Sequence, residues 1–312
     1  MAFSLVVATR ELPDYDNLPA AGSGGERCSW GLWGEGDRLG ALNLLTPDRA
    51  RRGAECVITG QTYRLDLALD AVDPPLYGRQ PLRHDVLGDA GHDDVLEINT
   101  QSSTQWDGFR HVSHPEHGYY NGVADAEHGI DAWAARIVGR AILVDVERWR
   151  ASVGRPISAD AAEAITAEDL LSTLASQKVS VEAGDILLLR TGWLSWYRAL
   201  DPGERAEVPS KLRVSGLEAS EDTVRLLWDL HVSAVAADNP SLEVWPPKAW
   251  GLGHAIHFHL LPLLGILIGE LFDLDALAEA CAADGRYDAF FTSAPLIVPG
   301  GVASPPGAIC VK

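Results

Sequence analysis

A group of polar residues suited to metal binding or acid–base chemistry lies in the segment 101–111. Gln101, Gln105, Asp107 and His111 are spaced so that their side chains can converge in an extended chain. A carboxylate beside an imidazole can hold a divalent metal or divide acid and base work, and either use suits hydrolysis. The other interpretation is a polar strand end, with Asp107 capping a turn and His111 at the surface.

A second group of candidate residues lies in the segment 254–270. It contains His254, His257 and His259, and Glu270 follows an apolar run at 266–268. His254 and His257 are three residues apart and would share a helix face, whereas His259 would point elsewhere. A carboxylate at the end of an apolar strand is a candidate for a raised pKa and a catalytic role. The alternatives are a polar helix face and a carboxylate paired with an arginine.

The segment 101–111 resembles the core motif of the metal-dependent cyclase family, which includes kynurenine formamidase and isatin hydrolase. That motif runs His-x-Gly-Thr-His-x-Asp-x-Pro-x-His. Its Thr, Asp and last His fall on Thr104, Asp107 and His111. Its first two His fall on Gln101 and Gln105, and its Gly and Pro fall on Ser103 and Phe109. Segments 33–46, 184–193, 237–240 and 299–306 also resemble a branch of this family in which Gln-Trp-Asp replaces His-x-Asp.

The resemblance implies the swivelling β/β/α fold of that family, an α/β architecture with a mixed central sheet. It also implies that a helical His and a Glu ending the next strand complete the site, and His257 and Glu270 occupy these positions. The expected catalytic residues are therefore His111, His257 and Glu270. The expected metal ligands are Gln105, Asp107 and His257. The expected substrate-binding residues are Gln101, Trp106, Phe109 and Tyr119.

Together these residues predict a hydrolase that cleaves a carbon–nitrogen bond of an amide, formamide or cyclic amide on an aromatic or cyclic small molecule. A metal held through Asp107, or His111 as general base, would activate water, and Glu270 would pass the proton to the leaving nitrogen. Hydrolysis of a lactone would need the same groups. Two alternatives are a non-hydrolytic cyclase or dehydratase of a biosynthetic pathway and a binding protein that has lost catalysis.

The two glutamines are the point at which this chain departs from its family. An amide oxygen is a weaker ligand than imidazole for Zn²⁺, whereas Mn²⁺ or Mg²⁺ suits oxygen donors. One expectation is a divalent metal, Mn or Zn, held by Asp107 and Gln105 with a His from the segment 254–259. The other is a metal-free site in which the Gln side chains bind the substrate and His111 is the base.

The composition favours a soluble enzyme with a small-molecule substrate. The chain has 312 residues, 46% of them hydrophobic, and a formal net charge of −19. An acidic surface repels nucleic acid and anionic membranes, so neither is expected as a partner. The four cysteines show no Cys-x-x-Cys spacing, and the sequence has no secretory leader or long apolar run, so a cytoplasmic location is expected. The resemblance implies a homodimer or larger homo-oligomer.

Strand and helix patterns alternate along the chain, which also predicts an α/β protein. We expect an irregular N-terminal arm over 1–37 and a single cyclase-like domain over 38–312. The proline-containing segment 70–94 is expected to be a long loop, and such loops are often functional. Strands are expected at 63–69, 95–100, 141–146, 186–190, 233–237, 266–269 and 289–298. Helices are expected at 46–57, 166–175 and 220–231, over the histidines, and at 274–283.

Overall fold

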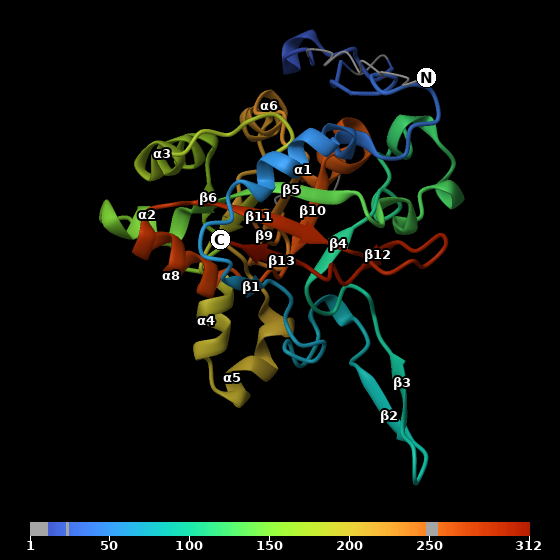
Figure 1. Ribbon diagram of the computed structural model, residues 1–312, viewed down its shortest axis with the longest axis vertical. Helices are drawn as coiled ribbons and strands as arrows, with labels where there is room; N and C mark the ends of the chain where they lie inside the picture. The colour runs from blue at the N-terminus through green and yellow to red at the C-terminus, as the bar shows by residue number, and fades with distance from the viewer. Residues whose placement is uncertain (1–11, 23–24, 248–254) are drawn as a thin grey trace.

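The computed structural model describes residues 12–22, 25–247 and 255–312, in which helices surround a mixed β-sheet (Figure 1). In this part of the chain the sheet contains nine strands, and its two ends are formed by segments far apart in sequence. The spatial order is β1 (Thr62–Arg64), β13 (Ile309–Val311), β11 (Asp288–Ser293), β5 (Ile137–Asp145), β7 (Ile186–Arg190), β9 (Ala234–Ala237), β10 (Leu267–Glu270), β4 (Gln105–Asp107) and β12 (Ala303–Ser304).

Continuous apolar segments form the centre of the sheet. β5, β7, β9 and β10 run parallel to one another, and every residue of β7 and β9 is buried. Strands covered on both faces need apolar side chains on both, which explains why these segments show no alternation. β11, β13 and β1 extend the sheet on one side and β4 and β12 on the other, all by antiparallel pairing. The predicted mixed central sheet is confirmed.

Several helices begin where the sequence has capping signals. The Thr46 hydroxyl accepts the Arg49 N–H at the start of α1, and Thr166 and Asp169 form a reciprocal capping box at the start of α3. α1 lies close against β5, because a Cβ on Gly53 would be 2.5 Å from the Gly139 backbone. The helices are α1 (Pro47–Ala54), α2 (Val146–Ser152), α3 (Ala167–Gln177), α4 (Trp193–Ala199), α5 (Pro202–Glu207), α6 (Glu221–Asp229), α7 (His257–His259) and α8 (Asp275–Asp284).

The segment that carries the second group of candidate residues folds as predicted. α7 covers His257–His259 and continues into a π-helical turn at Leu260–Leu264. Gly265 ends this turn with a φ of 64°, and β10 then delivers Glu270 as its last residue. His254 lies outside the described residues.

The predicted long loop at 70–94 is irregular only up to residue 82, and the strand predicted at 95–100 lies earlier, at residues 93–97, so both predictions are only partly correct. These residues include a two-stranded hairpin, β2 (Arg83–Leu87) and β3 (Asp93–Glu97), that projects from the rest of the molecule (Figure 1). Its turn contains Gly88 with a φ of 94°, a conformation that favours glycine. The segment 101–111 is therefore not delivered by a strand at 95–100. Turns surround its one short strand, β4.

Several predicted boundaries also change. β11 ends at Ser293 rather than 298, because Pro295 lacks the N–H that would continue the ladder. The first strand is limited to β1, and α1 ends at Ala54 rather than 57. α2, α4 and α5 lie where no helix was predicted.

The described part of the N-terminal arm packs on the body of the molecule. Tyr15 and Leu18 are buried in the main hydrophobic core, and the Ser29 hydroxyl donates to the Leu264 carbonyl oxygen at 2.8 Å. Apart from a 3₁₀ turn at Tyr15–Asn17, the described part of the arm is largely irregular. No helix in the described residues is long and apolar enough to cross a bilayer.

Candidate active site

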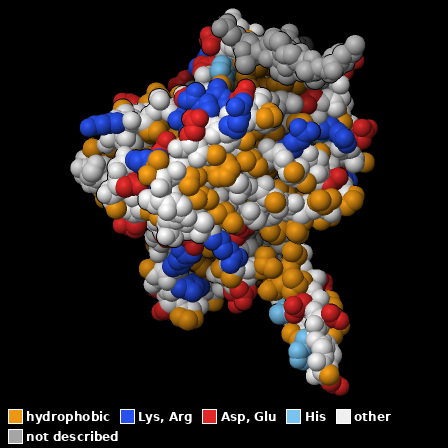
Figure 2. All heavy atoms as spheres, viewed as in Figure 1, with side chains coloured by type: hydrophobic (Ala, Val, Ile, Leu, Met, Phe, Trp, Pro, Cys, Tyr) orange, Lys and Arg blue, Asp and Glu red, His pale blue; other side chains and the backbone are white. Residues whose placement is uncertain are grey.

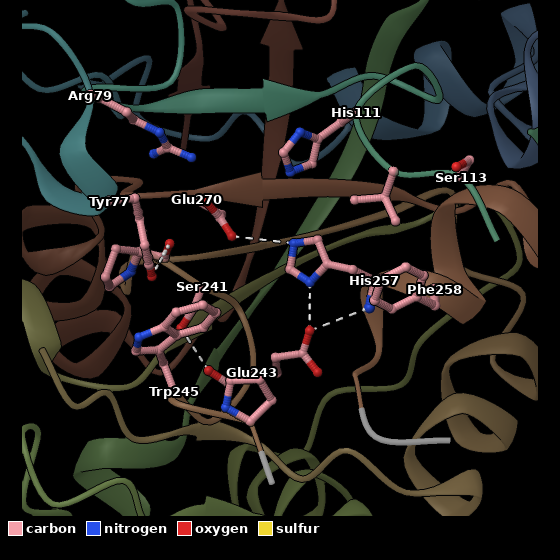
Figure 3. Close-up of a pocket in the computed structure, with 13 residues that line it drawn as sticks. Tyr77, Arg79, His111, Ser113, Ser241, Glu243, Trp245, His257, Phe258 and Glu270 are labelled. Carbon is pink, nitrogen blue, oxygen red and sulfur yellow. Dashed lines mark hydrogen bonds and ion pairs between the residues drawn. The ribbon is translucent and has the colours of Figure 1, made fainter. Parts of the chain in front are cut away.

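A cavity of about 430 Å³ opens near the carboxyl ends of β9 and β10, the usual location of ligands in sheets with parallel strands. Carboxylates, imidazoles and aromatic rings line it, and Figure 3 shows Tyr77 and Trp245 on one side with His257 and Phe258 on the other. The described lining residues are Tyr77, Arg79, His111, Val112, Ser113, Pro240, Ser241, Glu243, Trp245, Pro247, His257, Phe258 and Glu270.

His257 is oriented by Glu243. Its Nδ1 lies 2.6 Å from Glu243 Oε1, and the same carboxylate accepts the backbone N–H groups of Ile256 and His257. Nδ1 therefore donates to Glu243, and Nε2 faces the cavity, 3.4 Å from Glu270 Oε1 and 3.9 Å from Asp107 Oδ2. Burial lowers the pKa of His257, but the nearby carboxylates of Asp107, Glu243 and Glu270 outweigh it and raise the pKa well above the usual value.

Gln101 connects Asp107 to His111. Its amide nitrogen donates to Asp107 Oδ1 at 2.7 Å and lies 3.2 Å from His111 Nδ1. Since that amide is a donor, His111 Nδ1 is the acceptor and the ring proton lies on Nε2. Burial, the largest influence, lowers the pKa of His111. His111 thus has an N–H donor at Nε2.

Glu270 is a carboxyl group poised to exchange a proton near neutral pH. Burial, together with the neighbouring charge of Asp107, raises its pKa to about 7. Gln105 donates to Glu270 Oε2 at 2.6 Å, which leaves Oε1 directed at His257. Burial opposes ionisation of Asp107, yet the charges of His111 and His257 hold its pKa below the usual value. The two carboxyl groups therefore differ in charge at the same pH.

The donor set fits a divalent cation. Asp107 Oδ2 and Gln105 Oε1 are buried and accept no hydrogen bond from the described residues. Asp107, His111 and His257 each place a ligand atom within 4.8 Å of the others. The Glu243 carboxylate on His257 Nδ1 is the kind of partner that orients metal-bound histidines. A cation there would have to displace the Nε2 proton of His257, because its raised pKa keeps the ring protonated.

The structure brings Gln101, Gln105, Asp107, His111, His257 and Glu270 together. It does not bring the three aromatic candidates to the cavity. Trp106 is fully buried between Phe272 and Phe291, because alternation along β4 turns it away from Gln105 and Asp107. Phe109 packs on Tyr120 and Trp133 in the core, and Tyr119 lies near His128 outside the lining. The cavity is instead flanked by Tyr77, Trp245 and Phe258.

Among the described histidines of the segment 254–259, His257 enters the site. His259 faces a separate cavity near Glu26. A second cluster, formed by Glu26, His114 and His117, lies outside the active-site cavity. His114 Nδ1 accepts two backbone N–H groups, so its Nε2 carries the ring proton and is not a free metal ligand.

Of the charged or ionisable residues in the described lining, Glu243 and Arg79 were not singled out from the sequence. Glu243 follows β9 by a few residues, and its neighbours Asp238 and Asn239 did mark the exit of a buried strand. Arg79 lies in the segment 70–94, where only loop length suggested a function. Ligands often bind at the carboxyl ends of parallel strands. The position of Glu243 in the loop after such a strand was the signal that could have identified it.

Comparison with known proteins identifies the family. The Cyclase family model matches residues 56–244, and the chain belongs to this family. A crystal structure of a novel cyclase superposes with a TM-score of 0.81 at 35% identity, covering 91% of this chain and 99% of that one. No curated protein matches the chain closely enough to count as a relative.

More distant structures share the fold. Isatin hydrolase A from Ralstonia solanacearum has a TM-score of 0.61 at 18% identity, with 81% of this chain and 92% of that one covered. Isatin hydrolase A from Labrenzia aggregata, bound to benzyl benzoate, has a TM-score of 0.60 at 16% identity, with coverage of 80% and 93%. The resemblance to the cyclase family and its fold class are thus confirmed.

Proposed function

We propose that the protein hydrolyses a carbon–nitrogen bond of an amide, formamide or cyclic amide carried on an aromatic or cyclic small molecule. The main support is Glu270, a carboxyl with a pKa of about 7 in a cavity of ligand size, 3.4 Å from an oriented imidazole. The isatin hydrolases supply a weaker argument, because they share the fold and, by name, open a cyclic amide. A lactone is the alternative substrate.

Glu270, His111 and His257 have separate roles in the proposed hydrolysis. Ionised Glu270 takes a proton from a water molecule while the water oxygen forms a bond to the carbonyl carbon. His111 donates its Nε2 proton in a hydrogen bond to the developing oxyanion, and Gln101 keeps this tautomer in place. Glu270 then gives its proton to the leaving nitrogen as the carbon–nitrogen bond breaks, which yields an amine and a carboxylic acid. Protonated His257 steadies the Glu270 carboxylate.

We also propose that Asp107, Gln105 and His257 can hold a divalent metal, with Mn²⁺ suited to the oxygen donors. When bound, such an ion would polarise the substrate carbonyl and acidify water. Elemental analysis of protein purified without chelator, combined with activity after dialysis against EDTA, tests this proposal. Full activity without metal would remove it, and recovery on adding Mn²⁺ would support it.

The function is tested by an activity screen over aryl formamides, cyclic imides and lactones, followed by a matched pair of variants. His257→Gln should lower kcat/KM by at least about 100-fold, as loss of one group that stabilises charge in an active site does. His259→Gln, two residues along the chain and facing another cavity, should leave kcat/KM within about twofold. Equal effects of the two substitutions would contradict the assignment.

Labelled water distinguishes hydrolysis from the alternative, a non-hydrolytic cyclase or dehydratase reaction. In H₂¹⁸O the carboxylic acid product of a hydrolase gains one ¹⁸O. A cyclase or dehydratase acting on the same substrate would form its product without that label. Absence of ¹⁸O from the product of an active preparation would overturn the hydrolase proposal.

We further propose a homo-oligomer. The hairpin of β2 and β3 exposes apolar side chains along its length, and Figure 2 shows it as an arm with hydrophobic atoms on its surface. A two-stranded hairpin is marginally stable alone in water. A second copy of the chain would cover these side chains.

A further inference from the structure

We propose that Arg79 is an anchor for a negatively charged group, so that the substrate is a carboxylate-bearing amide on a ring. This inference rests on the proposed function, because it specifies the substrate of the same cavity. Arg79 is the one Lys or Arg among the described residues that line the cavity. In Figure 3 its guanidinium points into the space between His111 and Glu270.

Among the described residues, the Arg79 guanidinium has no ion-pair partner. Within the described ranges, no Asp or Glu oxygen lies within 4.0 Å of its guanidinium, whereas Arg110, Arg140 and Arg190 all meet carboxylates. Its hydrogen bond goes to the neutral backbone carbonyl of Gln101. A guanidinium has five N–H donors, so donors remain for a ligand. A partly buried cation of this kind favours a planar anion that accepts two parallel hydrogen bonds.

The guanidinium is held in place before a ligand arrives. It stacks on the Tyr77 ring at 5.0 Å, and the Tyr77 hydroxyl donates to the Pro240 carbonyl oxygen at 3.2 Å. Tyr77 has a φ of 58°, and Gly78 follows with a φ of 70°. Two consecutive left-handed residues direct Arg79 towards the cavity, and this conformation is unfavourable for tyrosine. Strain at a ligand-facing residue is consistent with a selected orientation rather than a chance one.

The neighbouring surfaces fit a ring. The Tyr77 and Trp245 rings meet edge to face at 5.0 Å, and Phe258 lines another part of the cavity. A ring placed against these aromatic side chains would be within the same cavity as Glu270 and Arg79. Its amide would then face Glu270 while its carboxylate faces Arg79. The acidic surface of the protein does not attract anions, so a dedicated cation in the cavity is needed to bind one.

Binding of defined probes to the Glu270→Gln protein tests the inference without any turnover. The probes are formanilide, which is neutral, and the three isomeric formamidobenzoates, which carry a carboxylate. Isothermal titration calorimetry should show at least one formamidobenzoate binding roughly tenfold or more tighter than formanilide. Arg79→Met should abolish this preference. Arg83→Met, in the exposed hairpin, is the matched control and should keep it.

One further probe keeps the test decisive. The methyl ester of the preferred isomer removes the negative charge without changing the protein, and it should bind no better than formanilide. Equal affinity for charged and neutral probes, or a preference that survives Arg79→Met, would overturn the inference. An equal loss of affinity for all probes in Arg79→Met would also overturn it. Failure of the proposed hydrolysis would instead appear as absent turnover by the wild-type protein with the carboxylate preference intact.

Discussion

Glu243 acts on the candidate site through His257. Its carboxylate accepts the Nδ1 proton and adds a negative charge beside the ring. Glu243→Gln keeps an acceptor oxygen but removes the charge, so the pKa of His257 should fall towards the usual value. NMR titration of the histidine ring signals measures this shift, with His259 as an internal reference. The activity should fall by about 10- to 100-fold, as for other residues that orient a catalytic or metal-bound histidine. An unchanged His257 titration would refute this positioning role.

Glu270 should set the pH dependence of the reaction. A base must be ionised, and burial together with Asp107 raises the pKa of Glu270 to about 7. We therefore expect kcat/KM to rise with pH through about 7 and to level off above it. Infrared spectra should show a protonated carboxyl band at about pH 6 that is lost at about pH 8. In Glu270→Gln the band at about pH 6 should be weaker, and the remainder belongs to the buried Asp238, whose pKa burial raises to about 6. A rise centred near 4.5, the ordinary value, would contradict this assignment.

Several of the residues that meet in the candidate site were identified from the sequence. The spacing and the family motif identified Asp107, His111, His257 and Glu270, whose side chains do meet. Trp106 was wrongly placed at the substrate because β4 is a true strand, in which neighbours of Gln105 and Asp107 face the opposite side. Glu243 could not be assigned its role, because that role depends on the backbone N–H groups at the start of α7, which come near only in the folded chain.

At the scale of secondary structure, the packing of β10 against its neighbours requires the absence of a side chain at Gly269. A Cβ on Gly269 would lie 2.6 Å from the Ala236 Cβ and 2.8 Å from the Trp106 ring. Gly269→Ala should therefore lower the free energy of unfolding by about 1–3 kcal/mol, as overpacking does in buried cores. Urea denaturation measures the change. Gly91→Ala is the matched control, because a Cβ there meets nothing within 4 Å, and it should change stability by less than about 0.5 kcal/mol.

The helices and strands that were predicted correctly are those whose signals lie within a few residues of one another in the sequence. Thr46, Thr166 and Ser220 signal helix starts through hydrogen bonds within three residues, so these helices were placed correctly. β7 and β9 were predicted because each is a short continuous apolar run in the sequence. The hairpin of β2 and β3 was missed because its strands pair with each other rather than with the main sheet, and their exposed residues lack a clear one-sided pattern.

For the whole molecule, the hairpin predicts the oligomeric state. Val86, Leu87, Val95 and Leu96 are each 45–59% exposed, which is unusual for four apolar residues on one small element. Light scattering should give a mass of at least twice the 33.6 kDa chain. Leu87→Asp combined with Leu96→Asp should shift the mass towards that of one chain. As a control, Ile58→Asp, which is also exposed but lies outside the hairpin, should leave the mass unchanged. A wild-type mass near 33.6 kDa would exclude the oligomer.

The order of strands in the sheet also governs when the site can form. β1 pairs with β13, and Gln105 on β4 meets Glu270 on β10 across 165 residues of chain. Such distant pairings must overcome a large loop-closure entropy before their contacts become favourable, so they slow folding. Asp107 and Glu270 therefore meet late, after most of the sequence has been synthesised and collapsed. Partly folded chains would hold the two carboxyl groups apart, so the chemistry of the site would arise only with the finished fold.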